Sequence, residues 1–225
     1  MIQLNISFFL FQNQFIMFKI FQKFTFLMLF ATVLLSSCAK IYYSPDAQQK
    51  AATHKIIAIV PPKVSISGGK NQDVAAVKIQ QEAESLSYQK EIYAWILKRK
   101  RQGKMTVDVQ ETDITNAKLK KMDYTENPIT SSELCKALGV DGVITSNISS
   151  IKMMGDGASV GLVFLTGAFI PNKNVTIDLS INDSEKLLFN YNHKMSGGIA
   201  SSPAAIVDAL MRNSSKKMPY VKVQP

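Results

Sequence analysis

The chain has 225 residues, a length that suits one domain of ordinary size or two small ones. Its 26 Lys and Arg against 17 Asp and Glu give a formal net charge of +9. The content of 46% hydrophobic and 19% charged residues is globular, which excludes a disordered, collagen-like or repetitive chain. Two cysteines exclude a disulfide-stapled scaffold and a multi-cysteine metal cluster, and two histidines leave little material for a histidine-based site.

The first 37 residues differ from the rest because they are rich in phenylalanine and contain no acidic residue. Read from Met17, a short segment with Lys19 and Lys23 precedes an apolar run over residues 24–35. A positive start, a short apolar stretch and small residues are the parts of a secretory signal peptide. The run is too short for a membrane-spanning helix, which needs about 20 residues. We therefore predict a signal peptide over residues 1–37, with Met17 as the true start.

The end of the apolar run carries a more specific motif. Leu35-Ser36-Ser37-Cys38 resembles the lipobox of bacterial lipoproteins. The resemblance implies that the Cys38 sulfur receives a diacylglycerol, that the chain is cut before Cys38, and that the new amine is acylated, with palmitate as a typical chain. Two or more such chains anchor a protein stably in a membrane. The alternative is a soluble secreted protein with an incidental cysteine after its signal.

The mature chain divides by composition into three parts. Residues 39–54 are mostly polar and predict a tether from Cys38 to a single domain over residues 55–213. Residues 214–225 predict a basic, frayed tail. The domain opens with a continuous apolar run over residues 55–60, which is typical of a central strand buried on both faces. Pro61-Pro62 is expected to end that strand, and Gly68-Gly69 marks the loop after it.

A long helix is predicted over residues 71–101, with Asn71 or Asp73 as its cap. Its expected buried stripe consists of Ala76, Ile79, Ala83, Leu86, Tyr93 and Leu97. A short strand over residues 106–110 and a weaker helix over 113–122 follow. A helix over residues 130–138 has a capping box of Thr130 and Glu133, and Gly139 ends it before a strand over 140–144 that continues toward Ile148 or Ile151.

The C-terminal half is expected to be antiparallel. Apolar and polar residues alternate over 175–181 and again over 187–193, with 182–186 as the connection, which predicts a hairpin with one solvated face. Ser202 and Pro203 begin a last helix, whose buried stripe holds Ile206, Val207, Leu210 and Met211. The fold class is therefore α/β (α+β): a mixed sheet with a long helix after the first strand, a C-terminal hairpin and a final helix.

Two segments carry a family resemblance. The strand Lys55-Ile-Ile-Ala-Ile-Val-Pro-Pro62 and the helix-turn-strand Glu133-Leu-Cys-Lys-Ala-Leu-Gly-Val-Asp-Gly-Val-Ile144 resemble periplasmic α/β domains. These include the N-terminal domain of TolB, the curli-secretion lipoprotein CsgG and small lipoproteins related to both. The resemblance covers roughly residues 55–150, and its motifs are short and mostly structural. It implies a fold and an envelope setting, and it carries over no catalytic residue.

Two segments are candidates for surface contacts. Lys98, Arg99, Lys100 and Arg101 form a basic run that suits anionic headgroups, and a solvated helix end explains the same run without a function. Residues 155–170 hold a long uncharged stretch with Leu162, Phe164 and Phe169. Because CsgG inserts hairpins into the outer membrane, this stretch is a candidate interface or insertion loop. A buried glycine-containing strand or a self-association loop is the alternative, since a lipid-facing strand alternates apolar and polar residues.

The remaining reactive residues favour structural roles. Cys135 is predicted to be a buried, inert thiol, because no sequence signature links His54 or His193 to it as a base. Asp141 is interpreted as a residue that stabilises a turn. The alternative is that it lines a ligand cleft at a strand–helix junction. Nucleotide-binding, nucleophile-elbow, metalloprotease and EF-hand motifs are absent from the sequence.

These observations favour a non-enzymatic envelope lipoprotein that binds other envelope proteins as an assembly or accessory subunit. Its expected location is the cell envelope, lipid-anchored at Cys38 and facing the periplasm from the outer membrane. No cofactor, metal or nucleic-acid partner is expected. The alternative is a subunit of an oligomeric secretion pore related to CsgG, with residues 155–170 as the interface or insertion loop. An enzyme is the third reading, and it lacks a recognisable cluster of titratable groups.

Overall fold

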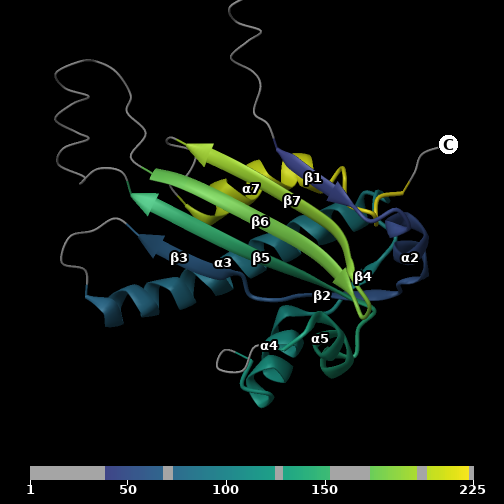
Figure 1. Ribbon diagram of the computed structural model, residues 1–225, viewed down its shortest axis with the longest axis horizontal. Coiled ribbons are helices and arrows are strands. Elements are labelled where there is room, and N and C mark those ends of the chain that lie inside the picture. The colour runs from purple at the N-terminus through teal and green to yellow at the C-terminus, as the bar shows by residue number, and fades with distance from the viewer. Residues whose placement is uncertain (1–38, 68–72, 125–128, 153–172, 197–201, 223–225) are drawn as a thin grey trace, which may run out of the picture. The chain divides into compact units, whose positions relative to one another are not determined.

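The computed structural model describes residues 39–67, 73–124, 129–152, 173–196 and 202–222, and residues 39–225 form one compact unit. Seven strands of the described chain form one sheet in the order β1-β7-β6-β5-β2-β4, with β3 paired to β5 beside β2 (Figure 1). The strands are β1 (Lys40–Tyr43), β2 (Ile56–Ile59), β3 (Lys63–Ser67), β4 (Asp108–Val109), β5 (Gly142–Lys152), β6 (Lys173–Asp183) and β7 (Leu187–Ser196). The helices are α2 (Ala47–Thr53), α3 (Val74–Arg101), α4 (Thr112–Lys121), α5 (Ser131–Leu138) and α7 (Pro203–Ser214). The mixed α/β sheet expected from the sequence is confirmed.

The first apolar run forms β2, which pairs with β5. After Pro61-Pro62 the chain continues as β3, which pairs with the same strand. Ile59 is opposite Ile144 of β5, whereas Lys63 is opposite Asn147, so β2 and β3 hold one residue more than β5 over this stretch. An extra residue of this kind is a β-bulge, and the prolines there have no amide hydrogen to pair. As expected, β2 ends before Pro61-Pro62. The sequence did not predict that the chain pairs again directly after the prolines, where residues 63–67 run parallel to β5 as β3.

The predicted hairpin is confirmed as β6 and β7, which pair antiparallel with a register shift between Ile181 and Asn182. On β6 the alternate residues Val175, Ile177, Leu179 and Ile181 are all fully buried. They belong to the larger core cluster together with residues of α3 and α7, which lie behind the sheet in Figure 1. The side chains between them point to the other face of the sheet.

Helix α3 buries a different stripe from the predicted one. Its buried residues are Tyr88, Gln89, Ile92, Ile96 and Arg99. Of the predicted stripe, Ile79 is 69% exposed, Leu86 46% and Leu97 38%. The helix carries apolar residues on more than one side, so spacing alone did not identify the face that meets the sheet. Asp73 caps the helix as expected, with its side chain accepting from the Ala75 amide at 2.9 Å.

Helices α4 and α5 cover the opposite side of β2. Ala58 and Val60 form a second core cluster with Leu119 of α4 and with Leu134 and Leu138 of α5. Strand β2 is therefore buried on both faces, as its continuous apolar run predicts. The capping box of Thr130 and Glu133 is present, and Gly139 adopts the left-handed conformation with φ 66°. An amide pair also joins α3 to α4, because Gln89 Nε2 and Asn116 Nδ2 each donate to the other side chain at 2.9 Å.

The structure differs from the sequence expectation at both ends of the compact unit 39–225. Residues 39–54, interpreted as a polar tether, contain β1, which pairs antiparallel with β7, and α2, which buries Ala47 and Ala51. Residues of the expected frayed tail are also packed, since Met218 and Tyr220 are buried and Val221 forms a β-bridge with Met105. Both segments are too short and too polar to be recognised alone, and they are ordered by pairing with strands distant in sequence.

Candidate interaction surface

One face of the sheet is polar over several neighbouring strands. On β6, the residues that alternate with the buried set are partly exposed, and they are Asn174, Thr176, Asp178, Ser180 and Asn182. Their neighbours in the register are Asn147 and Ser149 on β5, and Asn190, Asn192 and Lys194 on β7. We call these residues of β5, β6 and β7 the polar face. Figure 1 shows no helix in front of β6 and β7 among the described elements. The polar face is therefore a broad surface of amides and hydroxyls with the charged Asp178 and Lys194, and no helix of the described residues covers it.

Asp178 lies at the centre of the polar face. Its Oδ1 accepts from Asn190 Nδ2 at 2.7 Å, and its Oδ2 accepts from Asn192 Nδ2 at 3.2 Å. Asn190 Nδ2 also donates to Ser180 Oγ at 3.0 Å. Hydrogen bonds from neutral amides to a carboxylate are stronger than neutral pairs and hold the side chains in place. The network therefore gives the polar face a fixed pattern of donors and acceptors.

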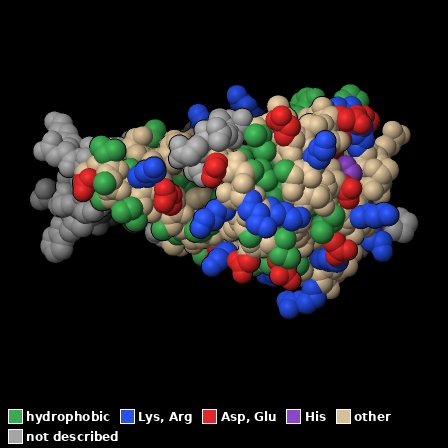
Figure 2. Space-filling model, turned by 90° about the horizontal axis from the view of Figure 1, so that it is seen from below, with side chains coloured by type: hydrophobic (Ala, Val, Ile, Leu, Met, Phe, Trp, Pro, Cys, Tyr) green, Lys and Arg blue, Asp and Glu red, His purple; other side chains and the backbone are tan. Residues whose placement is uncertain are grey.

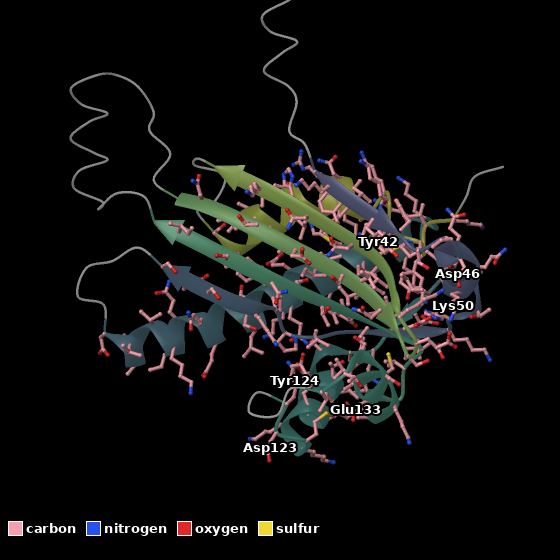
Figure 3. The ribbon with its side chains drawn as sticks, viewed as in Figure 1. Tyr42, Asp46, Lys50, Asp123, Tyr124 and Glu133 are labelled. Carbon is pink, nitrogen blue, oxygen red and sulfur yellow. The ribbon has the colours of Figure 1, made fainter. Side chains whose placement is uncertain are left out.

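The polar face ends at β1, which is an edge strand of the described sheet because, among the described strands, it pairs only with β7. Tyr42 and Tyr43 are 50% and 43% exposed, and Figure 3 labels Tyr42 beside β1. Tyr43 packs against Phe189 with ring centroids 5.2 Å apart and donates its hydroxyl hydrogen bond to the Lys217 carbonyl. An edge strand with exposed tyrosines presents unpaired backbone groups and amphipathic rings to its surroundings.

The basic run at the end of α3 does not form one exposed patch. Arg99 is buried, Lys100 forms an ion pair with Asp108, and Lys98 Nζ lies 4.8 Å from the centroid of the Trp95 ring. Arg101 is exposed. Three of the four side chains therefore have intramolecular contacts, and the run as a whole is not available to one anionic surface.

Cys135 lies on the buried side of α5 with 2% exposure. Burial raises the pKa of its thiol to about 11, so the neutral thiol is the form present at physiological pH. The environment is that of an inert core cysteine, as the sequence predicts.

Asp141 holds the start of β2. Its Oδ2 accepts from the backbone amides of Lys55 at 2.7 Å and Ile56 at 2.9 Å. The hydrogen bond from the Ile56 amide, together with that from Lys55, lowers the pKa of this carboxyl below its usual value. Because both contacts are to backbone, the structural interpretation of Asp141 is the one that its geometry supports.

A partly buried polar contact lies beside Asp141. His54 Nδ1 and the Tyr220 hydroxyl are 2.8 Å apart, and burial lowers the pKa of His54. Gly142 is next to both, because a Cβ added there would lie 2.9 Å from the Tyr220 hydroxyl and 3.2 Å from His54 Nδ1. This contact joins the C-terminal segment to the residues that precede β2, which explains why the tail is packed.

The other candidates lie outside the described residues. They are Cys38, Leu162, Phe164 and Phe169. The stretch over 153–172 joins β5 to β6, whose pairing continues to the last described pair, Lys152 opposite Lys173. Within the described ranges, no helix is both long and apolar enough to span a bilayer, and no group of three or more His, Cys, Asp or Glu is arranged to hold a metal.

The polar face has a partial signal in the sequence. Five polar residues stand at every second position from Asn174 to Asn182, which predicts only the solvated side of a hairpin. The alternation identifies a face of one strand. It does not show that the same faces of β5 and β7 continue it.

Comparison with known proteins identifies no family for the chain. No family model and no curated protein matches it. Among solved structures, it is similar to the hypothetical protein CT253 from Chlamydia trachomatis, with 12% identity and a TM-score of 0.38 over 74% of this chain and 96% of that one. It is also similar to a PelC dodecamer from Paraburkholderia phytofirmans, with 8% identity and a TM-score of 0.37 over 83% of this chain and 99% of that one.

Proposed function

We propose that the chain is a lipid-anchored protein of the bacterial cell envelope that acts by binding, as a non-enzymatic assembly or accessory subunit. The observation that carries this proposal is the sequence at Cys38. An apolar run preceded by lysines ends at a lipobox-like motif, and the compact unit begins at the next residue, Ala39. In such a protein the anchor supplies the location and the exposed surface of the domain supplies the binding.

The chemistry of the described residues supports binding rather than a reaction. The thiol of Cys135 is buried and protonated, and Asp141 is engaged by two backbone amides. By contrast, the polar face presents ordered amides and hydroxyls, and no helix of the described residues covers it. A polar surface of this kind can supply the direct and water-bridged hydrogen bonds that protein interfaces carry.

The anchor is tested by expressing the full chain in a bacterium and measuring the mass of the membrane-bound product. We expect diacylglycerol and fatty acid at an N-terminal Cys38, and a matched Cys38→Ser variant that leaves the membrane or stays unprocessed. A mature product of the same mass from a gene that starts at Met17 would support that start. An unmodified Cys38 in a soluble, processed protein would refute the anchor.

The binding role is tested by crosslinking in the intact envelope, followed by mass spectrometry of whatever is attached to the protein. Crosslinks to other envelope proteins would support the accessory role. A variant with Asn190→Asp and Asn192→Asp places like charges beside Asp178 and is expected to lose those crosslinks. Lys120→Gln on α4 is the control on another surface. Crosslinks that survive the Asn variants would remove the polar face from the binding site.

A second candidate function is a subunit of an oligomeric secretion pore. The observation that favours it is the position of the uncharged stretch, because residues 153–172 connect the paired ends of two eleven-residue strands, β5 and β6. We expect Leu162→Asp with Phe164→Asp to abolish a ladder of self-crosslinks while the domain stays folded. If the double variant unfolds, these residues belong to the core and the pore reading loses its support.

A further inference from the structure

In the sequence, the proposed anchor directly precedes the first described residue of the domain. Cys38 is followed by Ala39, which is partly buried against the larger core cluster, and then by Lys40, which pairs with Asn192 of β7. Consecutive Cα atoms are about 3.8 Å apart, so only one peptide separates Cys38 from a residue held by the fold. An acylated Cys38 would therefore bring the β1 edge itself to the bilayer, because no flexible tether intervenes.

The residues around β1 suit an anionic surface. Lys40 is the first residue of β1 and is opposite Asn192 of β7. Lys194 lies near it, because it is two residues farther along β7. Lys216 and Lys217 lie near its last residue, where the Lys217 carbonyl accepts from Tyr43. All four lysines are exposed, and none has an ion-pair partner in the part of the chain that the structure describes. We call these four lysines the basic edge.

The acidic residues near this edge are already engaged. Asp46 forms an ion pair with Lys186 at 2.6 Å, and Asp208 forms one with Arg212 at 2.7 Å. Asp178 is held by the amides of Asn190 and Asn192. The basic edge therefore keeps an uncompensated positive charge, and it flanks the exposed rings of Tyr42 and Tyr43, a residue type enriched where membrane meets water. On the face that carries α4 and α5, by contrast, basic, acidic and apolar side chains are mixed (Figure 2).

We propose that the β1 edge of the domain faces the membrane. The basic edge then contacts anionic phospholipid headgroups, and Tyr42 and Tyr43 lie at the boundary between membrane and water. This inference rests on the proposed lipid anchor at Cys38. It adds an orientation, because the sheet is then upright and the polar face looks along the membrane toward neighbouring envelope molecules. Each lysine near an anionic bilayer changes the ratio of docked to undocked domain roughly fivefold.

The chain permits a clean test of this orientation. Once Cys38 is a thioether, the buried Cys135 is the only other thiol, so a cysteine introduced at the surface takes a fluorescent label selectively. The full, acylated chain carrying Tyr42→Cys is placed in vesicles of phosphatidylglycerol and phosphatidylcholine that contain a headgroup quencher. The matched control is Lys120→Cys on α4. Figure 3 labels Asp123 and Tyr124, which follow α4 in the chain, on the other side of the domain from Tyr42.

We expect the label at position 42 to be quenched severalfold more than the label at position 120. Replacing all four lysines of the basic edge by Gln, in the Tyr42→Cys background, should remove most of that difference, as should phosphatidylcholine alone or high salt. Lys120→Gln with Lys121→Gln should leave it unchanged. The fluorescence of Trp95 reports whether each variant is folded.

Other outcomes would overturn the inference. Equal quenching at positions 42 and 120, or quenching at 42 that ignores both the lysines and the lipid charge, means that the β1 edge does not face the bilayer. A label at 42 that is shielded in detergent without phospholipid means that a second copy covers the edge instead. The mass of the purified chain separates the two proposals, because an unacylated Cys38 refutes the anchor, whereas an acylated chain without selective quenching refutes only the orientation.

Discussion

Gly142→Ala is expected to destabilise the domain, although alanine normally suits a strand better than glycine. The added Cβ would lie 2.9 Å from the Tyr220 hydroxyl, 3.1 Å from the Asn182 carbonyl oxygen and 3.2 Å from His54 Nδ1. The Asn182 carbonyl belongs to the β5–β6 pairing and is not free to move away. The close contacts of the added Cβ can therefore be relieved only if the Tyr220 side chain moves, and this side chain is 1% exposed and hydrogen bonded to His54.

The magnitude follows from two opposing effects. Overpacking a well-filled site costs about 1–3 kcal/mol. Replacing glycine in a strand interior gains roughly 0.5–1 kcal/mol through the lower entropy of the unfolded chain. The free energy of unfolding is therefore expected to fall by about 1–2 kcal/mol. It is measured by urea unfolding of residues 39–225, the compact unit, with the single tryptophan, Trp95, as the fluorescent reporter.

A double-mutant cycle separates the steric effect from others. Tyr220→Phe alone loses one hydrogen bond and should cost about 1 kcal/mol. In that background the closest contact of the new Cβ disappears, so Gly142→Ala should cost less than in the parent chain. Gly103→Ala is the control, because Gly103 has φ 67° and nothing within 4 Å of an added Cβ, so its cost arises from backbone strain alone. An equal cost of Gly142→Ala in both backgrounds, or a stabilisation, would refute the proposed contact with Tyr220.

Three further predictions use the same unfolding assay. Ile92→Ala, in the buried stripe of α3, should lower the free energy of unfolding by about 2–5 kcal/mol, whereas Ile79→Ala should lower it by less than about 0.5 kcal/mol. The reverse order would support the buried stripe expected from the sequence. Asp141 has a pKa below its unfolded value, so its stabilisation is present above about pH 4 and is lost as pH falls through the folded pKa. Asp141→Asn should therefore destabilise the domain near pH 7 and much less near pH 3, and a penalty independent of pH would contradict the hydrogen bonds to the backbone. Tyr88→Phe removes a buried hydroxyl that has no hydrogen-bond partner among the described residues, so stability should stay the same or rise by up to about 1 kcal/mol, whereas a clear loss would reveal a missed partner.

Local patterns in the sequence were sufficient for several elements. The alternation over 175–181 predicted β6, since period-two burial follows directly from strand geometry. The capping box of Thr130 and Glu133 predicted the start of α5, because both hydrogen bonds lie within one turn of chain. The burial of Cys135 also followed from its position on the apolar side of that short helix.

Elements that depend on distant partners were not predicted. Strand β1 has four residues, KIYY, and forms because β7 pairs with it from about 150 residues away. The C-terminal segment is ordered by Tyr220 and its contact with His54, a pairing that no local pattern encodes. On α3, the sheet and α7 select Ile92 and Ile96 for the core over Ile79, which has similar hydrophobicity.

The sequence by itself determined the fold class, the strands with clear alternation and the signal-like segment that ends at Cys38, because each of these depends on neighbouring residues. Only the tertiary structure decided that the sheet begins at Lys40, two residues after the proposed anchor at Cys38. It also decided that the polar sides of β5, β6 and β7 meet in one surface. These features arise from the register between strands far apart in the chain, and that register is set by packing over the whole domain.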